Sequence, residues 1–200
     1  MDDEKKRVGT IEVETPEQHR WLAALHESAH LVALWYRLNL VGRAVLVGDG
    51  GGLSTGLAHA ATFGRALFFA AGEQGERLAA KCRPPGTAPD PAPPGELSAN
   101  ASVAAREWFH TADVSDLRDD DLPVRAWAVR GPDPERWAFR YHRVRRTALA
   151  LVLRHRDDVL ELAARLYETG EVSTAAYFEE EGVTIITESG KRRRVRAPNP

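Results

Sequence analysis

The 200-residue sequence has very little cysteine and no long apolar run, and each absence argues against a class of protein. Its one cysteine, Cys82, cannot form a disulfide within the chain, which favours a reducing compartment. Apolar runs such as 148–153 are far shorter than the roughly 20 residues that span a bilayer. Residues 1–7 are charged and have none of the apolar core of a signal peptide. The sequence therefore predicts a soluble, cytoplasmic protein with no membrane partner.

A strong excess of charge of one sign is also missing. The chain carries 27 Lys and Arg against 29 Asp and Glu, for a formal net charge of -2. This balance gives no overall case for binding nucleic acid or an anionic membrane. The one strongly basic stretch, 191–196, is typical of a solvated chain end, and nucleic-acid contact is the less favoured alternative.

What the sequence does contain is His26-Glu27-Ser28-Ala29-His30, an H-E-x-x-H pattern. Residues four apart lie one above the other on a helix, so both imidazoles can reach a single metal ion. Glu27 projects from the adjacent face, where it can deprotonate a water molecule beside that ion. Imidazole nitrogens suit Zn²⁺. The motif predicts a zinc hydrolase with His26 and His30 as ligands and Glu27 as general base.

The surroundings of the motif strengthen this interpretation. Between Trp21 and Tyr36, nearly all residues outside the motif are apolar or small, as expected of a buried helix. A buried carboxylate is costly unless it is paired or lies near a metal. The alternative, that the histidines are ordinary core residues, leaves Glu27 without a role.

The remaining sequence predicts an α+β fold that is mostly helical, with a small β-ribbon beside the motif helix. Thr15 and Pro16 mark the start of a helix that runs to about Leu38 and carries the motif. Glycines at 48–52 separate two short strands. The predicted strands are 42–47 and 53–60, the further helices are 63–81, 98–111, 115–129, 134–155, 156–169 and 172–181, and the prolines of 83–97 predict an exposed flexible loop.

Two histidines leave the zinc one protein ligand short, and the acidic run 113–121 offers candidates. Taken alone, five carboxylates within nine residues are most simply a solvated loop. The incomplete site upstream favours a helix start that holds a ligand instead. Asp116, directly after the capping candidate Ser115, is the predicted third ligand, with Asp113 and Asp119 as alternatives.

The order of these features resembles the peptidase domain of FtsH-type proteases, the zinc module of ATP-dependent membrane proteases. That family shows a His-Glu-Ala-Gly-His helix, a β-ribbon, a Gly-Arg-Ala-Ala-Glu-Glu-like helix and an Asp-Leu pair that opens a later helix. The counterparts here are His26 to His30, strands near Val45 and Leu57, the segment 72–76, Asp116-Leu117, and a similar ending over 155–172. The resemblance covers about 21–178.

This resemblance implies that His26, His30 and Asp116 hold zinc, that Glu27 is the base, and that the strand 53–60 accepts substrate backbone by β-augmentation. The chain departs from the family in Ala29, which replaces a glycine, and in its proline-rich segment. The 200 residues also contain neither the ATPase module nor the membrane helices of those proteases.

We therefore expect a stand-alone, ATP-independent zinc metallopeptidase that hydrolyses peptides or unfolded protein segments. Its metallopeptidase-like domain covers 15–182, between a flexible N-terminal tail (1–14) and a basic C-terminal tail (183–200). The alternative is a non-catalytic, zinc-stabilised scaffold or a regulatory partner module. The sequence leaves the oligomeric state open.

Overall fold

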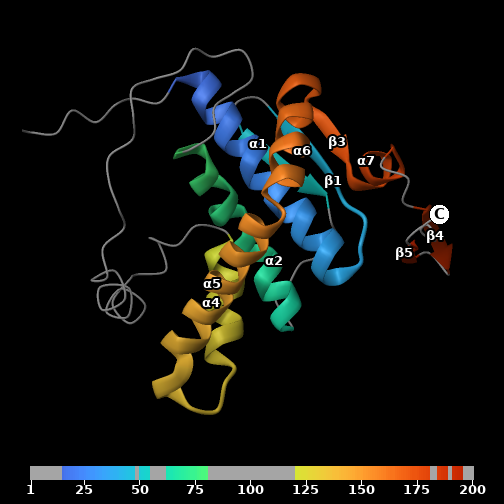
Figure 1. Ribbon diagram of the computed structural model, residues 1–200. Helices are drawn as coiled ribbons and strands as arrows, with labels where there is room; N and C mark the ends of the chain where they lie inside the picture. Colours follow the sequence, from blue (N-terminus) through green and yellow to red (C-terminus); the bar gives the residue numbers. More distant parts are fainter. Residues whose placement is uncertain are drawn as a thin grey trace, which may run out of the picture.

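The described part of the chain is mostly helical, with a small antiparallel sheet along one side of the central helix (Figure 1). The fold is that of a computed structural model, which describes residues 15–47, 50–54, 62–80, 120–180, 184–188 and 191–195. The helices are α1 (Pro16–Ala33), α2 (Phe63–Glu76), α4 (Asp121–Val129), α5 (Trp137–Arg154), α6 (Arg156–Thr169) and α7 (Thr174–Glu180). Short π- or 3-10-helical segments are η1 (Leu34–Leu38), η2 (Arg77–Ala80) and η4 (Pro134–Arg136). The strands are β1 (Arg43–Val47), β2 (Gly50–Ser54), β3 (Glu171–Ser173), β4 (Thr184–Glu188) and β5 (Lys191–Val195). The predicted α+β class, mostly helical with a small amount of β-structure, is confirmed.

The helix that carries the motif begins where the sequence predicted. Thr15 and Gln18 form a capping box. The backbone N–H of Gln18 donates to Thr15 Oγ1 at 3.3 Å, and the backbone N–H of Thr15 donates to Gln18 Oε1 at 2.6 Å. α1 continues directly into η1, which ends at Asn39 in the left-handed conformation, with φ of 52°. Asparagine adopts this conformation more readily than most residues, so it ends the helix at low cost.

α1 lies at the centre of the packing. It contacts both α2 and α6, and α2 in turn packs against α4 and α5. Gly75 permits the close approach of α1 and α2, because a side chain there would collide with the Leu25 carbonyl and the Ala29 methyl group. The segment of α2 around this glycine is thus held directly against the motif.

The sheet has the order β2-β1-β3, and both pairings are antiparallel. Arg43 pairs with Ser54 on one side and with Ser173 on the other. The second strand lies earlier than predicted, since it begins at Gly50 and takes in part of the glycine cluster that we expected to form only a turn. The remainder of the predicted strand, 55–60, lies outside the described residues.

The C-terminal region also differs from expectation. The helix predicted over 172–181 is present as α7, but it begins later than expected, at Thr174. Gly170 ends α6 at a φ of 78° and turns the chain into the sheet, so the residues before Thr174 form β3. The segment expected to be a simple basic tail contains the antiparallel pair β4 and β5. The arginines of β5 carry no apolar alternation that would predict a strand. β4 is rich in β-branched residues, a strand signal that the prediction of a basic tail did not use.

Two predictions, the loop 83–97 and the helix 98–111, lie outside the described residues. Among the helices that the structure describes, none has both the length and the apolar character needed to cross a bilayer.

Candidate metal centre

Three acceptor atoms converge where α1 meets the start of α4. His26 Nε2 and His30 Nε2 lie 3.1 Å apart, one helical turn from each other on α1. Asp120, the residue before α4, places its Oδ2 at 2.7 Å from His26 Nε2 and 2.9 Å from His30 Nε2. These three residues form a group whose ligand atoms could hold a metal ion.

The other nitrogen of each histidine determines which tautomer the site contains. His30 Nδ1 lies 2.8 Å from the Phe68 carbonyl oxygen, which can only accept, so this nitrogen donates. His26 Nδ1 lies 2.7 Å from Glu76 Oε1 and donates to that carboxylate in the same way. In the neutral form of each imidazole, Nδ1 therefore carries the proton and the Nε2 lone pair faces Asp120, as in metal-ligating histidines that a carboxylate or a carbonyl orients.

Three lone pairs that face one another repel unless a cation lies between them. Burial lowers the pKa of His26, but its hydrogen bonds to Asp120 and Glu76 outweigh burial and raise that pKa to about 10. Burial of Asp120 acts against its charge, yet the hydrogen bonds from both histidines hold its pKa well below the usual range. Without metal, the site at neutral pH therefore keeps a proton on His26, in the place where a metal ion would bind.

The dimensions of the group fit a small metal ion. Tetrahedral zinc with bonds of about 2.0–2.2 Å keeps its ligand atoms about 3.3–3.6 Å apart. The three observed separations, 2.7, 2.9 and 3.1 Å, need to widen by about 0.2–0.9 Å, which small side-chain rotations can provide. A Cβ atom at Gly72 of α2 would lie 2.5 Å from His26 Nε2 and 2.6 Å from His30 Nε2. The lack of a side chain at Gly72 is what leaves room for the imidazoles.

Glu27 lies beside this group and is 7 % exposed. Its Oε2 is fully buried and has no hydrogen-bond partner among the described residues. Burial raises the pKa of Glu27, while the neighbouring His30 and His26 lower it. A buried carboxylate oxygen without a partner destabilises the fold, so a structural role does not explain it. The same oxygen is available to accept a proton.

Access to the group comes from the side of His26 and Asp120. Their side chains are 21 % and 27 % exposed, whereas the side chain of His30 is only 4 % exposed. One side of the group therefore reaches solvent while the other is enclosed by the core.

A second set of side chains fixes the start of α4 to α2 and α5. Tyr141 donates its hydroxyl to Asp121 Oδ1 at 2.8 Å, and Arg145 Nη1 donates to the Tyr141 oxygen at 2.9 Å. Arg145 also pairs with Glu73. Asp121 follows the candidate ligand Asp120, so this network restrains the backbone that carries it.

The structure brings the predicted ligands His26 and His30 together, and Glu27 lies near enough for both histidines to shift its pKa. The predicted third ligand, Asp116, and the alternatives Asp113 and Asp119 lie outside the described residues. Within the described part, the carboxylate in the group is Asp120, and sequence reasoning did not select it although it belongs to the same acidic run.

Sequence reasoning also missed Glu76 as a partner of His26. The available signal was the spacing of Gly72, Gly75 and Glu76, which places two small residues and a carboxylate on neighbouring faces of one helix. Small residues at this spacing permit close helix packing, but they do not say against which helix.

Comparison of the chain with protein-family models, with curated proteins and with solved structures finds no match. The function is therefore argued from the geometry and chemistry of the site.

Proposed function

We propose that this protein is a zinc-dependent metallopeptidase. One observation carries the proposal: two oriented imidazoles and the Asp120 carboxylate converge beside the buried, unpaired carboxylate of Glu27. A cation explains the convergence, and a base beside that cation explains Glu27. The resemblance of the motif order to FtsH-type peptidase domains supports the same function.

Zinc is the metal that the donor set favours. Two imidazoles and one carboxylate are typical ligands of catalytic zinc, whereas structural zinc has four protein ligands in nearly every case. The described residues offer three ligands, which leaves a fourth position for water or substrate. When bound there, zinc would polarise the scissile carbonyl and lower the pKa of a neighbouring water molecule.

The residues of the chain then divide the work of hydrolysis. Glu27 accepts a proton from the attacking water and can later return it to the leaving amine. Glu76 and the Phe68 carbonyl hold the imidazoles in the tautomer that presents Nε2. The raised pKa of Glu27 brings this base closer to neutral pH, where a proton can be both taken and returned.

A substrate in extended conformation suits the sheet beside α1. β2 is the outer strand of the order β2-β1-β3, and it packs against α1. An outer strand can pair with the backbone of an extended peptide, which would lay that peptide along the motif helix. The proposed substrates are therefore peptides or unfolded segments of proteins.

The test compares the wild type with Glu27→Gln, both loaded with zinc, on disordered proteins and peptide libraries. The variant keeps the size of the side chain but loses the base, so hydrolysis should fall by about 10²-fold or more while zinc content stays unchanged. Peptide products are identified by mass spectrometry.

Two results would count against this function. If both zinc-loaded proteins are inert on every substrate, the non-catalytic scaffold becomes the better account. If Glu27→Gln is as active as the wild type, hydrolysis does not depend on the proposed base.

A further inference from the structure

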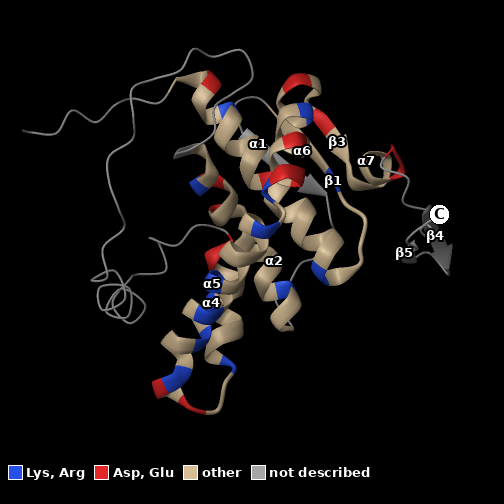
Figure 2. Cartoon of the chain, viewed as in Figure 1, with Lys and Arg blue, Asp and Glu red and all other residues tan. Residues whose placement is uncertain are grey.

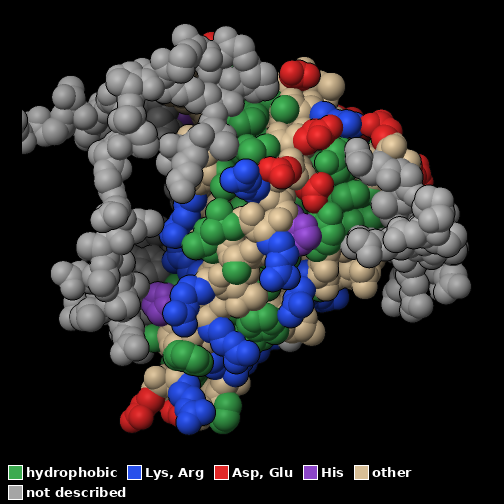
Figure 3. Space-filling view, in the orientation of Figure 1, with side chains coloured by type: hydrophobic (Ala, Val, Ile, Leu, Met, Phe, Trp, Pro, Cys, Tyr) green, Lys and Arg blue, Asp and Glu red, His purple; other side chains and the backbone are tan. Residues whose placement is uncertain are grey.

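Basic residues cluster on one face of the molecule, although the chain as a whole is slightly acidic. α5 contains five arginines and no acidic residue, although the whole chain carries a formal charge of -2. Figure 2 shows the arginines along α5, and Figure 3 shows Lys and Arg side chains gathered there while Asp and Glu side chains gather over α6. The segregation makes this face a local site of positive potential.

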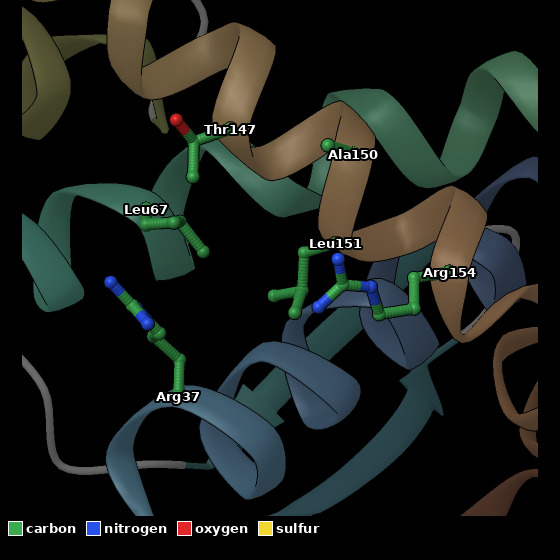
Figure 4. A pocket seen from close by; sticks show the side chains of 6 residues that line it. All are labelled: Arg37, Leu67, Thr147, Ala150, Leu151 and Arg154. Atoms are coloured by element: carbon green, nitrogen blue, oxygen red, sulfur yellow. The ribbon is translucent and has the colours of Figure 1, made fainter.

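A cavity of about 160 Å³ lies at one end of this basic face. Figure 4 shows its lining, with Arg37 from η1, Leu67 from α2, and four residues from α5. The α5 residues are Thr147, Ala150, Leu151 and Arg154. None of the lining residues belongs to the candidate metal centre, so the cavity is a separate feature of the protein.

The cavity combines an apolar floor with two cationic walls. Leu67 is buried and Leu151 half-buried, and Thr147 donates its hydroxyl to the Arg143 carbonyl at 2.8 Å. In Figure 4 the guanidinium group of Arg37 lies on the side of Leu67, and that of Arg154 lies beside Leu151, on the other side of the cavity. Both arginines are exposed, and neither has an ion pair or hydrogen bond within the described part of the chain.

Two other arginines of α5 already have partners. Arg145 pairs with Glu73, and Arg140 stacks over Trp127 with 4.3 Å between the guanidinium carbon and the ring centroid. Arg37 and Arg154 are the arginines that line the cavity, so they are the donors available to a ligand there.

The chemistry of the walls selects the ligand. A guanidinium group binds phosphate or carboxylate through two parallel hydrogen bonds. Two guanidinium groups on opposite sides match the two charges and three terminal oxygens of a phosphomonoester better than the single charge of a carboxylate. An apolar cavity of about 150 Å³ can hold a group the size of benzene, so this floor has room for an apolar group beside the phosphate.

We propose that the pocket between Arg37 and Arg154 binds a phosphomonoester that carries an apolar group. The phosphate lies between the two guanidinium groups, and the apolar group covers Leu67 and Leu151. The phosphomonoester can belong to a soluble metabolite or to the headgroup of a lipid such as phosphatidic acid.

Calorimetric titration of the full chain with phenyl phosphate, benzoate and inorganic phosphate tests the proposal. Phenyl phosphate should bind one to one, and about tenfold or more tighter than either of the other two probes. Arg37→Met and Arg154→Met should each weaken its binding by about tenfold or more. Arg146→Met is the matched control, because Arg146 is also exposed on α5 but does not line the cavity, and it should bind as the wild type does.

Flotation with phosphatidylcholine vesicles that contain phosphatidic acid separates the two sources of the phosphate. If the pocket serves a lipid, the vesicles bind the wild type and Arg146→Met but not Arg154→Met. If it serves a soluble compound, phenyl phosphate binds and the vesicles do not.

Three results would overturn the proposal. The first is that the folded wild type binds neither phenyl phosphate nor the vesicles. The second is equal loss in Arg146→Met and Arg154→Met, which would assign the binding to diffuse charge. The third is benzoate binding as tightly as phenyl phosphate, which would remove the preference for a dianion.

Discussion

On the scale of a single residue, Gly72 controls the space at the candidate metal centre. A methyl group at this position would lie within 2.6 Å of both Nε2 atoms, and it belongs to a helix backbone that cannot easily retreat. We expect Gly72→Ala to displace the imidazoles and to weaken zinc binding by about 10²-fold. Zinc affinity, measured by competition with a chromophoric chelator, checks this expectation.

Gly64→Ala is the matched control, since Gly64 lies on the same helix. The nearest atom to its added methyl group is the end of the flexible Leu38 side chain, at 2.9 Å, which can move aside. This variant should bind zinc as the wild type does. If Gly72→Ala binds zinc equally well, the histidines are not confined as the structure indicates.

If the candidate centre binds zinc, the proton on His26 should make that binding depend on pH. With a pKa of about 10, His26 is protonated at pH 7 in the metal-free protein, and zinc must displace that proton. Apparent zinc affinity should rise by about tenfold per pH unit between pH 7 and 9. Glu76→Gln removes one of the bonds that raise the pKa of His26, so its affinity should level off at a lower pH than that of the wild type. An affinity that does not change with pH would contradict the assignment of the proton.

The same proton stabilises the metal-free fold. Because the pKa of His26 is raised above 6.5, its contribution to stability is fully present below pH 6.5 and is lost as the pH rises toward 10. In the chelator-treated protein, the free energy of unfolding measured with urea should therefore decline over this pH range. In His26→Gln this decline should be absent.

The elements closest to the motif could be predicted from sequence because their signals are local. The Thr15 cap, the proline that follows it and the apolar run specify α1, and the motif spacing alone brings the two histidines to one face. Gly170 marks the end of α6 for the same reason, since it supplies the left-handed conformation there.

Partners from other elements could not be predicted this way. Asp120 is 90 residues from His30 along the chain, and Glu76 is 50 residues from His26, so only tertiary packing decides which carboxylate reaches the motif. The choice of Asp116 rested on a local cap and a local Asp-Leu pair. Neither signal reports the distance to α1.

At the scale of elements, Arg145 links three helices. It pairs with Glu73 of α2 and donates to Tyr141, which holds Asp121 at the start of α4. We expect Arg145→Met to lower the free energy of unfolding by about 1–3 kcal/mol, because partly buried polar groups lose their partner. It should also weaken zinc binding, since the backbone of Asp120 is then less restrained.

Arg146→Met again provides the comparison, because Arg146 is exposed and has no ion pair among the described residues. It should change the free energy of unfolding by less than about 0.5 kcal/mol. Urea unfolding and chelator competition measure both variants. Equal effects in the two would show that the network does not support the site.

At the scale of the whole molecule, the candidate metal centre joins segments that the chain keeps far apart. α1 supplies both histidines and Glu27, α2 supplies Glu76 and the space at Gly72, and the start of α4 supplies Asp120. A metal ion bound there would tie the start of α4 to the central helix, so binding energy would also be folding energy.

The most direct test of this account is the zinc content of Asp120→Asn and Asp116→Asn, beside that of the wild type. All three proteins are purified without chelators and measured by elemental analysis. We expect about one zinc per chain in the wild type and in Asp116→Asn, and little zinc in Asp120→Asn, whose amide is a poor replacement for the carboxylate. Full zinc in Asp120→Asn, or no transition metal in the wild type, would contradict it.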